Sequence, residues 1–331
     1  MKLKYSFFLI IIVFAVIATS YSCSGDDGGE ADINAERMLQ FVEDISGFAR
    51  GINPDFIIIP QNGPELAFIN TDPGEGIAAS YISAIDGIGI EELFYDYTLA
   101  VDNERLSMLR TLKSSVKIMV SDYISPSDTS KINDAIARNN TEGFISFPRS
   151  SDNYNYQKIP AYDIEYEPSD NIGTLAEANN YLYLINRDDY PNKQDMLDEI
   201  AATNYDVILT DLYLYGFDTG EPFTKTEINA LKVKANGKKR LVISYISIGS
   251  AENFRYYWKP GWGLGNPSWI KKPYEGWEEE FWVEFWNPAW REIIFGDGDP
   301  DKDSYIKSIV EAGFDGVYLD NVEAYYFLVN D

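Results

Sequence analysis

The sequence contains no histidine, and among its 331 residues the single cysteine is Cys23. Without histidine, nucleophilic schemes of the Ser-His-Asp or Cys-His kind and histidine-based metal sites are excluded. With one cysteine, no disulfide can form within the chain, so a hydrophobic core must hold the fold. Proton transfer therefore falls to carboxylates, tyrosine or lysine, and we expect no metal and no other cofactor.

Basic residues are also scarce. There are 27 Lys and Arg against 53 Asp and Glu, which gives a formal net charge of −26 at pH 7. Nucleic acid is a poor partner for such a chain, because phosphate binding requires basic patches. The acidity either serves solubility alone or attracts a cationic ligand.

Residues 1–22 have the pattern of an export signal. Lys2 and Lys4 precede an apolar run and a small-residue junction that ends at Cys23, a pattern typical of a cleaved signal peptide and not of a spanning helix. We predict that Cys23 is lipidated; the alternative is an ordinary cleaved signal with an incidental thiol. The small and acidic residues 23–33 are predicted to be a solvated tether. The predicted location is an exported lipoprotein, attached to the membrane through its lipid only.

Residues 34–331 are predicted to form a single domain around a parallel sheet. Most of its apolar runs are continuous, which is typical of strands buried on both faces. The eight runs are Phe56–Pro60, Ser83–Ile90, Val116–Asp122, Gly143–Phe147, Tyr181–Asn186, Tyr205–Asp211, Arg240–Ile248 and Phe314–Asp320. Strand–helix alternation repeated eight times predicts an α/β fold of the (β/α)8 TIM-barrel type. A doubly wound open sheet is the alternative, but no Gly-rich phosphate loop follows any run.

Helical patterns lie between or before most of the runs. One is predicted to begin with a cap at Asn34 and to end at Gly51. Another opens with a capping box of Thr224 and Glu227 and extends to Ala235. The polar stretch 149–180 is predicted to be an internal linker between two half-barrels of four strands each.

Carboxylates gather at the carboxyl ends of the runs, where the active sites of such barrels lie. The residues at these ends are Asn62, Glu91, Asp122, Asp211, Glu252 and Asp320. Five acids at one rim predict a carboxylate-lined cleft, because like charges crowded in a cleft are costly unless they are used. Paired carboxylates without histidine are typical of glycoside hydrolysis, in which one protonates the leaving oxygen and the other attacks the anomeric carbon or activates water.

All seven tryptophans fall between Trp258 and Trp290. Indole rings offer flat platforms for the C–H faces of sugars. We predict sugar stacking for Trp258 and Trp262, and a loop-core role for Trp286 and Trp290. The acidic segment 297–303 superficially suggests a calcium loop, but it has Lys302 where such loops need glycine, and a solvated turn is favoured.

Three segments resemble glycoside hydrolase family 114, the endo-α-1,4-polygalactosaminidases and their bacterial relatives. They are Tyr245–Trp258 (beginning Tyr-Ile-Ser-Ile-Gly-Ser-Ala-Glu), Trp282–Trp290 and Phe314–Tyr325 (beginning Phe-Asp-Gly-Val-Tyr-Leu-Asp). In the family's usual order, a helix and four further strands follow the last of these. Here the similar segments stand at the front, in Ala35–Arg50, Phe56–Gly63, Ile85–Tyr95, Val116–Tyr123 and Gly143–Pro148. The resemblance thus implies a circularly permuted barrel, with Phe56–Pro60 a parallel neighbour of Phe314–Asp320.

The resemblance also implies roles for individual residues. Asp320 corresponds to the nucleophile and Glu91 to the general acid/base of a retaining enzyme, whose carboxylates stand about 5–5.5 Å apart. Glu92 competes with Glu91, and strand alternation should point only one of them inward. The predicted substrate-binding residues are Asp211, Glu252, Tyr245, Arg255, Trp258, Asn62 and Asp122.

The implied partner is a polysaccharide with α-1,4-linked galactosamine, which is cationic when deacetylated. Two alternatives stay open: hydrolysis of a different glycan, and a non-catalytic glycan-binding surface lipoprotein.

Overall fold

The computed structural model describes residues 27–149, 156–167, 170–214 and 222–329. The predicted export signal and Cys23 lie outside these residues. No helix in the described ranges is long and apolar enough to cross a membrane.

All eight predicted apolar runs contain strands. These are β1 (Ile57–Pro60), β2 (Gly87–Asp96), β4 (Lys117–Tyr123), β5 (Ile145–Ser146), β6 (Tyr181–Tyr183), β7 (Val207–Asp211), β8 (Leu241–Ser247) and β12 (Gly316–Asp320). Most of their residues are buried, which explains why the runs are apolar throughout instead of alternating. The largest difference is at 83–90, because Ser83 and Ala84 still belong to a helix and the strand continues to Asp96.

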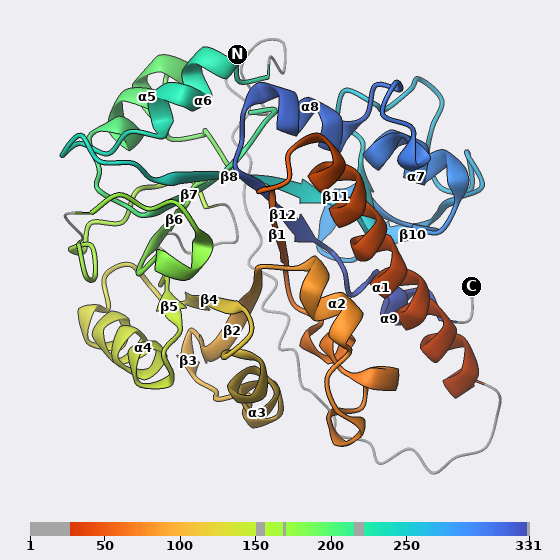
Figure 1. Cartoon of the computed structure of the whole chain (residues 1–331), viewed down its shortest axis with the longest axis horizontal. Helices are drawn as coiled ribbons and strands as arrows, with labels where there is room; N and C mark the ends of the chain where they lie inside the picture. Colours follow the sequence, from red (N-terminus) through yellow and green to blue (C-terminus); the bar gives the residue numbers. More distant parts are fainter. Residues whose placement is uncertain (1–26, 150–155, 168–169, 215–221, 330–331) are drawn as a thin grey trace, which may run out of the picture.

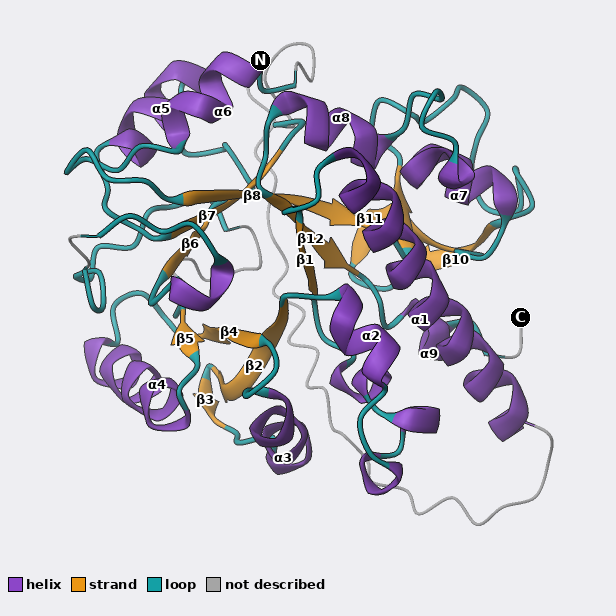
Figure 2. Ribbon diagram, viewed as in Figure 1, coloured by secondary structure: helices purple, strands orange, loops and turns teal. Residues whose placement is uncertain are grey.

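Helices lie on the outer side of these strands (Figures 1 and 2). They are α1 (Asp27–Ile52), α2 (Ala79–Ala84), α3 (Asn103–Leu112), α4 (Thr129–Glu142), α5 (Lys193–Ala201), α6 (Lys225–Leu231), α7 (Pro288–Phe295), α8 (Tyr305–Ala312) and α9 (Ala324–Phe327). Short 3-10 turns are η1 (Pro64–Ala67), η2 (Ile69–Thr71), η3 (Pro73–Glu75), η4 (Leu175–Glu177) and η5 (Gly296–Gly298).

The eight strands follow one continuous parallel order. A five-stranded sheet has the order β1-β12-β8-β7-β6, and a second sheet contains β2-β4-β5. A parallel bridge between Gln61 and Gly89 links the two at β1 and β2. The predicted pairing of the first and last strands is confirmed, with Ile57 opposite Gly316 and Pro60 opposite Leu319. The architecture is therefore mixed α/β with parallel sheets.

The two ends of this strand order, β5 and β6, approach each other through side chains. Phe147, just after β5, packs on Tyr181 of β6 with ring centroids 5.4 Å apart. The described residues contain no backbone ladder between β5 and β6. Tyr156 stacks on Tyr183 at 3.7 Å, so aromatic rings fill the space between these strands.

A small antiparallel sheet stands beside the parallel strands and was not predicted. It consists of β9 (Ser250–Glu252), β10 (Ile270–Tyr274) and β11 (Trp277–Val283), in the order β10-β11-β9. It follows β8 directly, and Figure 2 shows β10 and β11 next to α7. A two-residue strand β3 (Thr98–Leu99) also pairs with the end of β2.

Two predicted helix boundaries were wrong. The first helix begins at Asp27, so Asn34 is a buried residue within it and not its cap, and the described part of the predicted tether is helical. Although Gly28 and Gly29 disfavour a helix, no glycine or proline follows them before Asn34, and Ala31 favours one. Helix α6 has its predicted capping box but ends at Leu231, because Val233 pairs with Lys239 in a tight bridge.

The stretch 149–180 connects β5 to β6, as predicted for a linker, but it is also part of the core. Tyr156, Ile172, Leu175 and Ala178 are buried, and Arg149 is 1% exposed. A segment that served only as a connection would expose its side chains to solvent, so the burial of these residues shows that the described part of the stretch also packs against the core.

Candidate active site

Asp320 ends β12 at the carboxyl edge of the parallel sheet, where it is partly exposed. Its Oδ2 accepts a hydrogen bond from the hydroxyl of Tyr245 at 2.5 Å. Its Oδ1 accepts from the backbone N–H of Asn321 at 2.7 Å. Tyr245 lies on β8 opposite Tyr318, which stands two residues before Asp320 on β12. The side chains of Tyr245 and Asp320 therefore fall on the same face of the sheet, and the strand register brings them together.

Glu91 lies two strands away on β2, with β1 between them. The side-chain amide of Asn62 accepts from the Glu91 backbone N–H at 3.2 Å, and the Asn62 N–H donates to Gly89 at 2.7 Å. Asn62 has a φ of 60°, which asparagine tolerates better than most residues. The predicted residue Asn62 therefore fixes the backbone of Glu91.

Glu91 and Glu92 both face the same buried arginine, which contradicts the expectation that only one points inward. Arg149 donates to Glu91 Oε1 at 2.7 Å and to Glu92 Oε1 at 3.2 Å. The physical reason is a bulge: Glu92 has a φ of 56°, and the β2–β4 register shifts after Glu91. A bulge breaks the alternation of side chains along a strand.

Asp320 and Glu91 are electrostatically coupled. Burial, and next the charge of Glu91, raise the pKa of Asp320 to about 7, against the lowering effect of the Tyr245 and Asn321 hydrogen bonds. A carboxyl group with such a pKa next to a second carboxylate is typical of catalytic pairs.

Two more acids border this pair and were not among the predicted site residues. Burial and the charge of Glu65 raise the pKa of Glu323 to about 7. Burial and the charges of Glu252 and Asp320 raise the pKa of Glu280 to about 8. Glu280 belongs to β11 and accepts from Ser250 Oγ at 3.0 Å.

The antiparallel sheet also brings a tyrosine to the acids. Burial and, in order, the charges of Asp320, Glu280, Glu91 and Glu323 raise the pKa of Tyr274 above its usual range. The Tyr274 ring packs on Trp282 at 4.2 Å. Tyr274 thus stands within the field of all four carboxylates.

Comparison with known proteins bears on this arrangement. Residues 201–331 match the model of glycoside-hydrolase family GH114. The resemblance to this family is confirmed over that range, which contains Asp320 and Tyr245. Glu91 and Asn62 lie outside it.

Three curated proteins are similar in sequence to this chain over 132 to 159 residues. Uncharacterized proteins of Methanocaldococcus jannaschii, Deinococcus radiodurans and Thermotoga maritima are 33%, 32% and 28% identical over 159, 132 and 155 residues. The alignments cover 48%, 40% and 47% of this chain. They cover 42%, 38% and 42% of those proteins, so the chain spans less than half the length of the relatives it matches.

Other predicted residues within the GH114 match form a separate buried network. Arg255 donates to Asp211 Oδ2 at 2.6 Å and to both oxygens of Glu252 at 2.6 and 2.9 Å. The three side chains are only 3–6% exposed. Burial raises the pKa of Asp211 to about 6, with Arg255 opposing. In the structure these three side chains contact one another. That they bind substrate stays a prediction.

Asp122 does not fit its predicted role as a substrate-binding group. It is fully buried, and its carboxylate accepts from the backbone N–H groups of Phe94 and Tyr95 and from Asn139. These bonds attach the bulged part of β2 to β4 and α4. A strand-end carboxylate can thus be structural, and the sequence position alone does not distinguish the two.

The predicted core role of Trp290 and Trp286 can be compared with their burial, whereas sugar stacking by Trp258 and Trp262 stays a prediction. Trp290 is fully buried, and Trp286 is partly buried beneath the guanidinium of Arg37 at 4.6 Å. Trp258 is partly exposed but stacks on Phe281 at 5.6 Å and meets Trp262 edge-on at 5.7 Å. One face of Trp258 is therefore already covered by protein.

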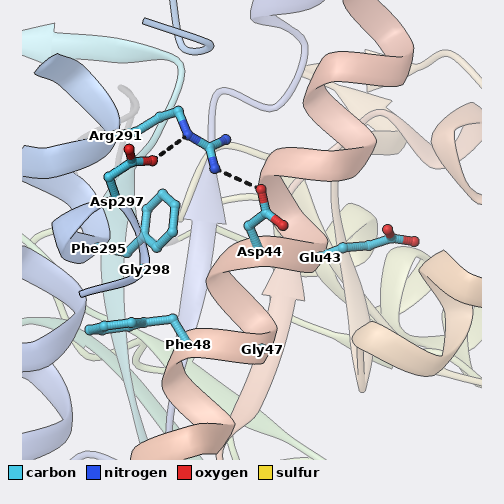
Figure 3. Close-up of a pocket in the computed structure, with 8 residues that line it drawn as sticks. All are labelled: Glu43, Asp44, Gly47, Phe48, Arg291, Phe295, Asp297 and Gly298. Atoms are coloured by element: carbon cyan, nitrogen blue, oxygen red, sulfur yellow. Dashed lines mark hydrogen bonds and ion pairs between the residues drawn. The ribbon is translucent and has the colours of Figure 1, made fainter. Parts of the chain in front are cut away.

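A hollow of about 420 Å³ lies elsewhere, between α1 and α7 (Figure 3). Arg291 bridges Asp44 and Asp297 there, while Glu43 points away from the hollow. None of the predicted site residues lines it. Within the described ranges, no group of three or more Cys, Asp or Glu side chains could hold a metal ion.

Proposed function

We propose that this protein is a glycoside hydrolase whose two reacting carboxylates are Asp320 and Glu91. The observation that carries the proposal is that both carboxylates lie at the carboxyl ends of the regular parallel pairing of their strands and interact with each other. Among the charges that raise the pKa of Asp320, that of Glu91 has the largest effect. The GH114 match supports the same class of reaction.

In the proposed mechanism, Asp320 attacks the anomeric carbon and Glu91 protonates the leaving oxygen. Glu91 then takes a proton from water, which hydrolyses the glycosyl–Asp320 ester with overall retention of configuration. Tyr245 fits this assignment, because its hydroxyl stabilises the ionised form of Asp320 that attack requires.

The proposed substrate is a polysaccharide containing α-1,4-linked galactosamine, as the family resemblance implies. The net charge of −26 and the acids around Asp320 support a cationic polymer, because clefts of one sign of charge concentrate ligands of the other. We also propose export and attachment through a lipid on Cys23, from the pattern of residues 1–23 alone.

The fold we propose for the site is a closed TIM barrel in permuted order. The β1–β12 pairing and the β1–β2 bridge support it, because strands near the two ends of the sequence then occupy adjacent positions. The ring contact between Phe147 and Tyr181 supports closure between β5 and β6.

The test is product release by the purified full chain from α-1,4-galactosaminogalactan, beside Asp320→Asn and Glu91→Gln. Oligosaccharides from the wild type, and none from either variant, are expected. The matched control is Glu311→Gln, an exposed acid on α8, which should retain wild-type activity.

A second candidate is non-catalytic glycan binding. The observation that favours it is the ion pair between Arg149 and Glu91, which engages the proposed acid in the ligand-free protein. No product release, with equal glycan binding by the wild type and both variants, would replace the hydrolase by this candidate. Release from another glycan would correct the substrate only.

A further inference from the structure

We infer that Arg149 and Tyr156 are positioning residues that hold Oε1 of Glu91, so that Oε2 is the oxygen that gives and takes the proton. The part played by Oε2 rests on the proposed function, whereas the hold on Oε1 is a property of the structure. Both residues belong to the stretch 149–180, for which the sequence predicted only a connecting role.

The contacts converge on one oxygen. Arg149 Nη2 donates to Glu91 Oε1 at 2.7 Å, and the Tyr156 hydroxyl donates to the same atom at 2.6 Å. Among the described residues, Oε2 receives no hydrogen bond from the protein. Two donors on Oε1 fix the rotation of the carboxylate and leave Oε2 for the substrate.

Arg149 is itself held in place. Its Nε donates to Tyr156 at 2.7 Å and to Ser121 at 3.3 Å, and its guanidinium lies 4.9 Å from the ring centroid of Tyr123. The side chain is 1% exposed. A buried guanidinium is stable only where anions and hydrogen bonds compensate it, and Glu91 and Glu92 supply the anions. An arginine confined in this way is a rigid support.

The same hydrogen-bond network determines where the hydroxyl proton of Tyr156 points. Arg149 donates to its oxygen, and the Ser121 hydroxyl lies 2.8 Å away and can donate as well. The hydroxyl proton of Tyr156 is then directed to Glu91. The tyrosine ring stacks on Tyr183 with an interplanar angle of 16°, which fixes the hydroxyl's position.

Arginines brace Glu91 from two sides. Arg105 on α3 donates to the backbone carbonyls of Glu91 and Glu92 at 2.9 and 3.2 Å, while Arg149 binds the side chains. The charged or titratable groups that act on Glu91 from its own and neighbouring elements are Glu92, Arg105, Arg149, Tyr156, Tyr181, Tyr183, Tyr274, Tyr318, Asp320 and Glu323.

The proton step follows from this geometry. The Oε2–H bond breaks as the proton passes to the glycosidic oxygen, the C–O bond cleaves with its electron pair moving to that oxygen, and Asp320 forms the new bond to carbon. In the second half, water returns a proton to Oε2 and its oxygen replaces Asp320 on carbon. Oε1 keeps its two donors throughout, so no reorganisation of the support is required.

The test compares Tyr156→Phe, Arg149→Lys and Arg149→Met with the wild type. Tyr156→Phe should lower kcat about tenfold with little change in KM, the effect of one lost hydrogen bond. Arg149→Lys keeps the charge but loses the fork across two carboxylates, so kcat should fall while the pH profile stays in place. Arg149→Met loses the charge, and the limbs of the pH profile should move to higher pH.

A residue with a merely structural role would reduce stability without moving the pH profile. The matched control is Arg110→Met, which removes an arginine that also binds a glutamate, Glu142, through two contacts but stands 54% exposed. Folded Arg149→Met and Tyr156→Phe proteins with wild-type kcat and pH profile would overturn the inference.

Crystal structures of the wild type and Tyr156→Phe separate this inference from the proposed function. If the wild type hydrolyses no glycan, the function fails, but the hold on Oε1 is still observable. It is supported if both donors contact the same carboxylate oxygen of Glu91 in the wild type and the carboxylate turns in the variant. It is overturned if the two donors contact different oxygens, or if either contacts none, in the wild type.

Discussion

The hydroxyl of Tyr245 acts directly on the proton affinity of Asp320. Its hydrogen bond favours the carboxylate and opposes the raising effects of burial and Glu91. Tyr245→Phe should therefore raise the pKa of Asp320. Because attack requires ionised Asp320, the ascending limb of the pH–rate profile should move to higher pH and kcat at neutral pH should fall about tenfold. Tyr166→Phe, at a 62% exposed tyrosine, is the control; an unmoved limb in Tyr245→Phe contradicts the assignment.

A single glycine controls how closely β2 approaches the interior tyrosines. A Cβ at Gly89 would lie 1.9 Å from the hydroxyl oxygen of Tyr318, so Gly89→Ala should destabilise the fold by about 1–3 kcal/mol through overpacking. Urea unfolding measures the effect, and Tyr318→Leu should relieve part of it in the double variant. Gly47→Ala on α1, where a Cβ meets nothing within 4 Å, should instead stabilise by about 0.5–1 kcal/mol.

The sequence allowed Asp320 and Glu91 to be placed because each lies at the end of an apolar run, and parallel strands bring such ends together. Tyr245 was placed by the family resemblance. It did not allow Arg149 to be identified, because that residue opens a polar stretch in which an arginine is ordinarily solvated. Glu280 closes the acidic run Glu278–Glu280, whose pattern is that of an exposed turn. Tertiary burial, which no local pattern encodes, distinguishes these residues from their neighbours.

At the scale of elements, the eight parallel strands were predictable and the antiparallel sheet β9-β10-β11 was not. Strands buried on both faces are apolar throughout and stand out in a sequence. Strand β11 begins Trp-Glu-Glu-Glu, and its first residues are exposed, so neither an apolar run nor strict alternation marks it. The bulge at Glu92 could not be predicted either, because it involves hydrogen bonds from the backbone of Phe94 and Tyr95 to Asp122, which belongs to the neighbouring strand β4.

The antiparallel sheet and α9 expose aromatic rings near the acids. Tyr274 packs on Trp282, and Trp282 stacks on Phe327 at 4.7 Å. Trp277 at the hairpin and Tyr326 are 40% and 68% exposed. Trp277→Ala and Tyr326→Ala should each raise KM for a long polysaccharide about fivefold or more, with little effect on a short chromogenic glycoside. Equal effects on both substrates would place these rings outside the path of the polymer.

At the scale of the whole molecule, the buried acids make stability depend on pH in an unusual direction. Asp211, Asp320, Glu323 and Glu280 have pKa values raised to about 6, 7, 7 and 8. A raised folded-state pKa means that the folded protein holds the proton more tightly than the unfolded chain. The stability from these groups is therefore complete below their ordinary pKa values and is lost as pH rises toward 8.

We expect Tm to fall between pH 5 and pH 8, measured by calorimetry at constant ionic strength. Glu280→Gln should reduce the fall, with a gain of about 2 kcal/mol over the wild type at pH 8. Glu311→Gln, which removes an exposed acid, should leave the slope unchanged. A Tm that rises across this interval, or an identical slope in Glu280→Gln, would show that these acids ionise in the folded protein as easily as in water.

The position of β12 between β1 and β8 also governs how the protein can form during synthesis. Strand β1 leaves the ribosome early, yet its partner on the five-stranded sheet comes only after nearly all of the described chain has followed. Until then, β1 and β8 each present an unpaired edge, and the apolar face of α1 has no complete sheet to cover. Such long-range pairing folds slowly and exposes nascent chains to aggregation. The protein should thus depend on chaperones during translation far more than an α/β protein of equal stability in which the first strand pairs with strands that follow it closely in the sequence.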